Sequence, residues 1–126
     1  MFTRQQIAEA KATAAVANGH HEHDDCILIA CQWLDAQKRV KKPNQQSWSR
    51  PLKHIIESWA GRYVSSDDVT VAAHLLGLKG TYPRFNISTR LTLPSERRLA
   101  GIGEAMRHQS YRENHDPAAT YARIEL

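Results

Sequence analysis

The sequence has few cysteines and no long apolar segment, and each shortage excludes a class of protein. Only Cys26 and Cys31 occur among the 126 residues. Two residues five apart on one helix cannot bring their sulfurs into disulfide geometry, so we expect buried thiols in a reducing compartment. No run approaches the roughly 18 apolar residues that a membrane span needs, and residues 1–6 contain no apolar signal core. We therefore expect a soluble cytoplasmic protein with no membrane partner.

The motifs of several enzyme classes are also missing. The chain has no glycine-rich phosphate loop, no Gly-x-Ser-x-Gly elbow and no Cys-x-x-Cys pair. His54, His74 and His108 fall on expected helices, and no Ser, Cys or carboxylate stands at a catalytic spacing from them that the sequence reveals. We expect a protein that is not an enzyme and that uses no cofactor.

Acidic residues are absent from two long intervals. The chain has 17 Lys and Arg against 13 Asp and Glu, which gives a net charge of +4 and favours polyanionic partners. No acid occurs between Asp35 and Glu57, and none occurs between Asp68 and Glu96. If the two intervals meet in space, they form one basic face.

The first acid-free interval combines cations with a tryptophan in a polar loop. Its lysines and arginines can neutralise phosphates, and an exposed Trp48 indole can stack on a base. The same residues can engage an acidic protein surface, where Trp and Arg are common anchors. Alternatively, Trp48 folds back onto the core and leaves a solvated basic helix end. The candidate partner-binding residues of the two intervals are Lys38, Arg39, Lys41, Lys42, Trp48, Arg50, Lys53, Arg84 and Arg90.

A cluster of potential metal ligands precedes the longest apolar stretch. Residues 20–25 read His-His-Glu-His-Asp-Asp, and a transition metal could accept three of these side chains if the backbone curled. Consecutive ligands seldom face one centre, so we expect no bound metal and a solvated loop whose acids cap the next helix. If a metal binds, the candidate ligands are His20, His21, His23 and Asp24.

The doublet His23-Asp24 resembles that of a family of helical metal-dependent phosphohydrolases. That family also needs a histidine well upstream and an aspartate far downstream in a larger bundle, and only the doublet is present here. A metal-dependent phosphohydrolase is therefore a third-ranked function.

Apolar periodicity predicts a compact all-α domain, a bundle of four to five helices with one irregular extended connection. The central helix is expected at residues 24–40, because eight of the nine residues at 26–34 are apolar. Asp24 and Asp25 suit its start, and the cations from Lys38 onward suit the negative end of its dipole. The single domain 1–126 is completed by helices at 3–17, 51–62, 66–77 and from 95, an extended connection at 81–93, and a loosely packed tail from about 114.

Residues 69–91 match part of a helix-turn-helix motif. Ala73 and Gly77 fit the first helix and the turn of that motif. Gly80 and Pro83 fall where the recognition helix should lie, and an interior proline breaks a helix. An ordinary amphipathic helix that ends at a glycine explains the same residues. A DNA-binding transcriptional regulator that uses residues 66–91 is the second-ranked function.

Two stretches resemble small accessory proteins encoded by temperate bacteriophages and plasmids. They are residues 24–37 (DDCILIACQWLDAQ) and residues 71–92 (VAAHLLGLKGTYPRFNISTRLT). The resemblance includes no functional motif. It implies a bacterial cytoplasm and a protein that inhibits or redirects host machinery, as anti-CRISPR proteins block a defence nuclease.

The leading expectation is thus a non-enzymatic binding protein of a bacterial mobile element. Its expected partner is a host protein or a protein–nucleic acid complex, and nucleic acid itself is the alternative partner. A homodimer is also compatible with the sequence, because the thin apolar stripe of the first helix could cover a second subunit as readily as its own core.

Overall fold

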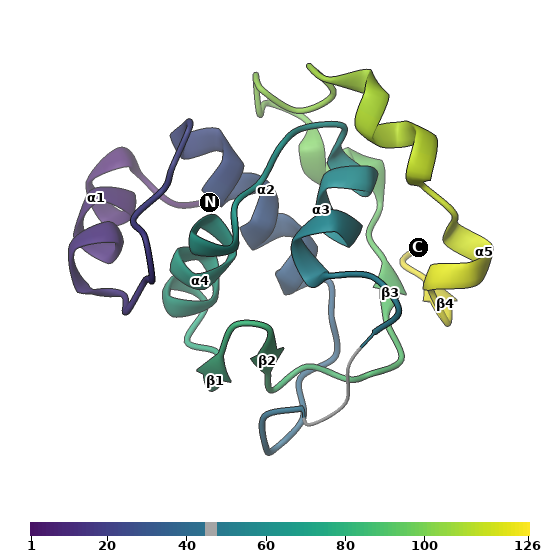
Figure 1. Ribbon diagram of the computed structural model, residues 1–126, viewed down its shortest axis with the longest axis horizontal. Helices are drawn as coiled ribbons and strands as arrows, with labels where there is room; N and C mark the ends of the chain where they lie inside the picture. Colours follow the sequence, from purple (N-terminus) through teal and green to yellow (C-terminus); the bar gives the residue numbers. More distant parts are fainter. Residues whose placement is uncertain (45–47) are drawn as a thin grey trace.

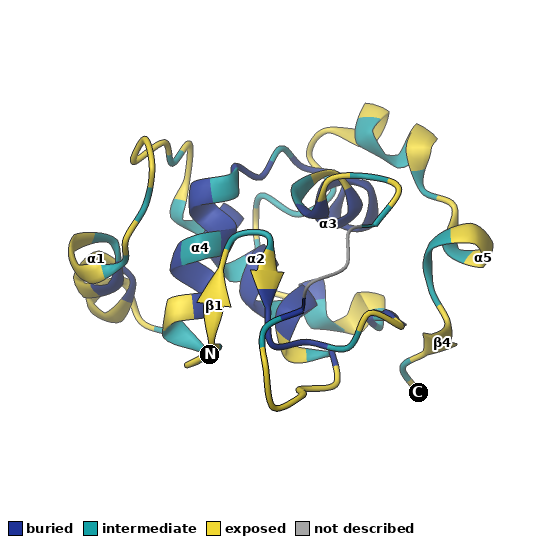
Figure 2. Ribbon diagram, turned by 60° about the horizontal axis from the view of Figure 1, so that its bottom comes forward, coloured by how far each residue is buried: buried dark blue, intermediate teal, exposed yellow. Residues whose placement is uncertain are grey.

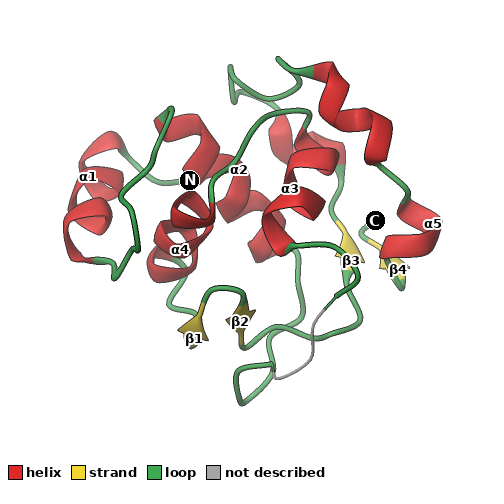
Figure 3. Ribbon diagram, viewed as in Figure 1, coloured by secondary structure: helices red, strands yellow, loops and turns green. Residues whose placement is uncertain are grey.

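The computed structural model describes residues 1–44 and 48–126, and helices make up most of their regular structure (Figures 1 and 3). The elements in chain order are α1 (Arg4–Thr13), α2 (Asp24–Asp35), α3 (Leu52–Ala60), α4 (Ser66–Leu75), β1 (Gly80–Thr81), β2 (Arg84–Phe85), β3 (Thr92–Leu93), η1 (Glu96–Leu99), η2 (Gln109–Asn114), α5 (Pro117–Thr120) and β4 (Arg123–Ile124). Here η marks a 3-10 helix. The prediction of an all-α protein is therefore only partly correct, because short strands form two small two-stranded sheets.

Helix α2 lies at the centre of the core, as its apolar sequence predicts. It packs against α1, α3 and α4, and Figure 2 shows the buried faces of these helices turned toward one another. The N-cap is His23, whose Nδ1 accepts a hydrogen bond from the backbone N–H of Asp25 at 2.9 Å. Asp24 and Asp25 occupy the first turn, where carboxylates are favourable. The buried residues of α2 are Cys26, Ile27, Ile29, Ala30, Cys31, Trp33 and Leu34.

Helix α2 ends at Asp35, five residues before the predicted end at 40. The chain leaves the helix because the next residues pair with a distant segment. The backbone N–H of Ser88 donates to the carbonyl of Lys38 at 2.8 Å, and that of Val40 donates to the carbonyl of Asn86 at 2.9 Å. The predicted placement of the cations at the C-terminal end of this helix is therefore wrong.

The predicted helices at 51–62 and 66–77 are confirmed as α3 and α4, with ends within two residues of the prediction. Helix α1 is shorter than predicted and ends at Thr13. The helix expected from residue 95 is only the short η1. Gly101 and Met106 adopt φ values of +82° and +62°, so a continuous right-handed helix cannot pass through them.

Residues 109–126 form a surface arm that includes the predicted tail from about 114, and none of its residues is buried. Strand β4 pairs in parallel with β3. The hydroxyl of Tyr121 accepts a hydrogen bond from the indole N–H of Trp33 at 2.9 Å, and burial raises the pKa of Tyr121 to about 12. The carboxylate of Glu125 accepts from the guanidinium of Arg98 at 2.6 Å. These contacts tie the arm to α2 and η1.

Among the described residues, no helix is both long enough and apolar enough to cross a lipid bilayer.

Candidate functional site

The two acid-free intervals lie side by side in the structure, along the lower edge of the molecule in Figure 1. Strands β1 and β2 form an antiparallel pair in which Gly80 faces Phe85. On the other side of β2, Arg39 and Ile87 form an antiparallel bridge, and the backbone N–H of Asn44 donates to the carbonyl of Phe85 at 3.0 Å. We call residues 38–44, 79–81 and 84–90 together the basic ribbon.

The basic ribbon concentrates the positive charge of the protein. It contains no acidic residue, so ten cations and thirteen acids remain in the rest of the chain. The ribbon thus carries a formal charge of +7 on a chain whose net charge is only +4. Its cations, all exposed, are Lys38, Arg39, Lys41, Lys42, Lys79, Arg84 and Arg90. Lys79 was not among the predicted partner-binding residues, although its place in the second acid-free interval could have revealed it.

Most of these cations are available to a ligand. Within the described residues, five of the seven side chains have no hydrogen-bond or ion-pair partner, namely Lys38, Lys41, Lys42, Lys79 and Arg90. The guanidinium of Arg39 donates to the carbonyl of Leu76 at the end of α4, at 2.8 Å. A phosphate or carboxylate can therefore bind most of the ribbon without breaking an internal ion pair.

The helical core holds the backbone of the basic ribbon in place. The side chains of Phe85 and Ile87 belong to the core and are 2% and 0% exposed. The amide of Asn86 connects all three segments, because its Oδ1 accepts from the backbone N–H of Lys79 at 2.7 Å and its Nδ2 donates to the carbonyl of Val40 at 3.0 Å. The exposed cations therefore project from a fixed backbone.

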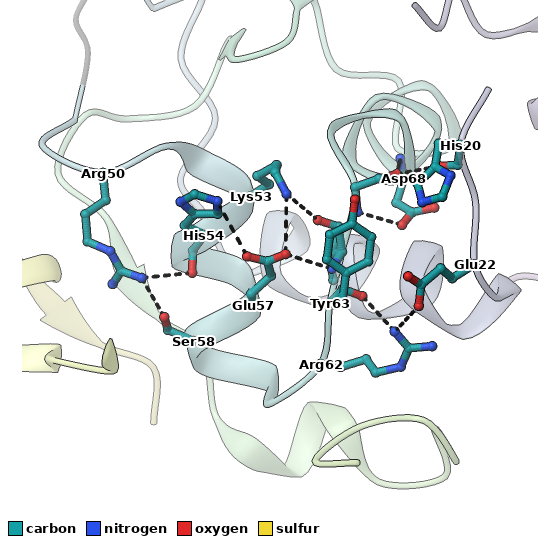
Figure 4. Close-up of polar contacts among 12 residues, drawn as sticks. His20, Glu22, Arg50, Lys53, His54, Glu57, Ser58, Arg62, Tyr63 and Asp68 are labelled. Carbon is teal, nitrogen blue, oxygen red and sulfur yellow. Dashed lines mark hydrogen bonds and ion pairs between the residues drawn. The ribbon is translucent and has the colours of Figure 1, made fainter. Parts of the chain in front are cut away.

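Trp48 and Arg50 were predicted to bind a partner, but both make internal contacts. The indole N–H of Trp48 donates to the carbonyl of Thr89 at 3.1 Å, and the ring packs against the core. Figure 4 shows the guanidinium of Arg50 directed at α3, where it donates to the Oγ of Ser58 at 2.6 Å. It also donates to the carbonyl of Asn114 in the arm at 2.9 Å. Both side chains are half-buried, and their polar groups bond within the protein.

Lys53, another predicted partner-binding residue, neutralises a buried acid. Its Nζ lies 3.5 Å from the carboxylate of Glu57, whose side chain is only 4% exposed (Figure 4). The same ammonium lies 4.7 Å from the ring centroid of Tyr63. Lys53 therefore serves the stability of α3 and stands outside the basic ribbon.

The potential metal ligands at 20–25 are directed at separate partners and do not converge. Among the residues that the structure describes, no group of three or more His, Cys, Asp or Glu side chains is placed to hold a metal ion. His21 pairs with Asp68, Glu22 with Arg62, His23 with the N-terminus of α2, Asp24 with Lys11, and Asp25 with the backbone N–H of Glu104. Figure 4 shows the carboxylate of Glu22 directed at Arg62, with His20 lying above it beside Asp68. The structure thus does not bring His20, His21, His23 and Asp24 together.

The loop that carries these histidines is fixed to the first turn of α4. The carboxylate of Asp67 accepts hydrogen bonds from the backbone N–H groups of Ala17, Asn18 and His20 at 2.9–3.2 Å. Burial alone would raise the pKa of Asp67, but these donors outweigh it and lower the pKa. The polar residues of this region therefore have a structural role.

The second half of the predicted helix-turn-helix motif is a β-hairpin. Helix α4 ends at Leu75, and β1 and β2 follow within the next ten residues. Residues 78–91, all of which the structure describes, contain no helix. The recognition helix that a helix-turn-helix motif needs is absent here, and Gly80 and Pro83 lie in the hairpin, where the sequence predicts an extended connection from residue 81.

Together, the fold and the surface define a small, mainly helical protein that exposes an acid-free basic ribbon at one edge. No protein-family model, curated protein or solved structure matches this chain.

Proposed function

We propose that this protein binds the phosphate backbone of nucleic acid through the basic ribbon. The observation that carries the proposal is that two acid-free intervals, separated in sequence, place seven exposed cations on one hydrogen-bonded surface. Lysine and arginine side chains that neutralise phosphates release condensed counterions, and this release gives affinity without a preformed pocket.

A phosphate backbone suits the basic ribbon better than an acidic protein surface does. Four of the seven cations are lysines, and lysine is depleted at the centres of protein interfaces, where Trp and Arg are enriched. Trp48 and Arg50, the two residues best suited to anchor a protein partner, make internal contacts. If the protein acts on host machinery, as the resemblance to phage accessory proteins implies, we propose that it does so through the nucleic acid which that machinery handles.

Reversing two charges of the basic ribbon tests the proposal. The double variant Lys41→Glu and Lys42→Glu should bind labelled DNA, duplex or single-stranded, at least about 30-fold more weakly than the unchanged protein at about 100 mM salt. Both side chains are exposed and have no partner in the described residues, so the fold should be unaffected. Fluorescence anisotropy measures the dissociation constant, and circular dichroism checks the fold.

The matched control is the double variant Arg4→Glu and Arg123→Glu. It changes the net charge by the same amount, at exposed positions on α1 and β4 that lie outside the basic ribbon. This control should bind within about threefold of the unchanged protein, since it loses only long-range attraction, which salt screens. An equal loss of affinity in both double variants would show that total charge alone sets the affinity. Failure of the unchanged protein to bind any DNA at low salt would refute the proposed function.

A further inference from the structure

The side chains around the basic ribbon also indicate which form of nucleic acid it binds. We infer that the ribbon binds duplex nucleic acid and contacts its phosphates without reading its bases, an inference that rests on the proposed function. The inference comes from how the aromatic rings and the amides beside the exposed cations are used.

The aromatic rings beside the basic ribbon are held by the core or by the backbone. Phe85 is 2% exposed. The half-buried Tyr82 accepts a hydrogen bond at its hydroxyl from the backbone N–H of Lys53 at 3.1 Å, and its ring meets that of Phe85 edge to face. Trp48 packs against the core and donates its N–H to Thr89. Proteins that bind single strands stack bases on exposed aromatic rings, and the described part of this surface does not present such a platform.

Among the residues that the structure describes, the amides of Asn86 and Gln37 beside the basic ribbon are likewise withdrawn from solvent. Asn86 is 7% exposed, and both ends of its amide bond to the backbone of neighbouring segments. Gln37 is 6% exposed, and its amide exchanges hydrogen bonds with the backbone of Thr92. Asparagine and glutamine read adenine edges in the major groove, so these two residues cannot supply that contact.

Among the described residues of the ribbon, the exposed polar side chains are the seven cations and the hydroxyls of Thr81 and Thr89. Four of the cations are lysines, which contact phosphates as point charges. Of the three arginines, Arg39 already donates to the carbonyl of Leu76.

The spacing of the cations is fixed by the paired backbone. Neighbouring antiparallel segments lie about 4.8 Å apart, so three segments span about 10 Å, and residues along each advance by about 3.4 Å. Duplex DNA is stiff over about 50 nm and carries one charge per about 1.7 Å of its axis, so its phosphates form an equally rigid array. A flexible single strand must lose conformational freedom to match the same cations.

The test compares probes of equal length on the unchanged protein. Two duplexes of about 24 base pairs with unrelated sequences, and one single strand of the same length, are titrated at about 100 mM salt. The duplexes should bind within about threefold of each other and at least about tenfold more tightly than the single strand. A single strand that binds as tightly as the duplexes, or duplexes that differ more than about tenfold, would overturn the duplex inference and leave the proposed function standing. Absence of binding to every probe would overturn both.

The variant Trp48→Leu adds a second test, because leucine keeps an apolar side chain against the core and removes the aromatic ring. Binding of duplex and of single strand should stay within about twofold of the unchanged protein when the melting temperature is also unchanged. A loss of about fivefold or more for the single strand alone would assign stacking to Trp48 and contradict the inference.

Discussion

The affinity of this protein for duplex DNA is expected to fall by between about 500-fold and about 6,000-fold as the salt concentration rises from about 50 to about 200 mM. The logarithm of the binding constant falls with the logarithm of salt concentration by about 0.9 for each phosphate neutralised. The lower value corresponds to the five ribbon cations without an internal partner, and the higher value to all seven. Anisotropy titrations at four or five salt concentrations measure this slope.

The single variant Lys42→Glu shows whether the slope belongs to the basic ribbon. It should reduce the slope by about 0.9, the value for one phosphate contact, and leave the fold unchanged. A slope smaller than about 2 for the unchanged protein would mean that at most two phosphates are contacted. A slope that Lys42→Glu leaves unchanged would place the contacts outside the ribbon.

Replacing Gly80 with alanine is expected to lower the free energy of unfolding by at least about 3 kcal/mol. Gly80 has a φ of +102°, where side chains are strained, and an added Cβ would lie 2.2 Å from the backbone carbonyl oxygen of Arg84. That oxygen belongs to β2, so the clash can be relieved only by opening the hairpin. Urea unfolding followed by tryptophan fluorescence measures the change.

Gly77 supplies the matched control, since it precedes the same hairpin and also has a positive φ, +69°. A Cβ added there would meet no atom within 4 Å, so Gly77→Ala carries only the strain of a left-handed backbone, about 1 kcal/mol. Equal losses for the two substitutions would show that the carbonyl of Arg84 does not exclude a side chain at residue 80.

The central helix could be predicted because its evidence is local. The apolar run at 26–34 is too long to be left in water, and α2 buries it as expected. The end of α2 could not be predicted in the same way, because Lys38 pairs with Ser88, fifty residues later in the chain. Helix propensity near Lys38 gives no information about that partner.

In the candidate site, too, local features could be predicted from the sequence and contacts between distant residues could not. Counting acids identified both halves of the basic ribbon, since exposed charge is visible in a sequence. The two halves meet through Asn86, whose amide bonds to Lys79 on one side and Val40 on the other. An asparagine between Phe85 and Ile87 gives no sign of this role in the sequence. The sequence left open whether Trp48 is exposed or folds back onto the core. The internal contacts of Trp48 and Arg50 could not be predicted because their partners, Thr89 and Ser58, become their neighbours only in the folded chain.

The most direct test of the account is an NMR titration of the nitrogen-15-labelled protein with duplex DNA. The account predicts that backbone amide resonances of residues 38–42 and 79–90 shift together and saturate at the same DNA concentration, while those of α1 and of the arm at 109–126 stay in place. Shifts confined to one of the two intervals, or centred on α1 or the arm, would contradict the conclusion that the two intervals act as one binding surface.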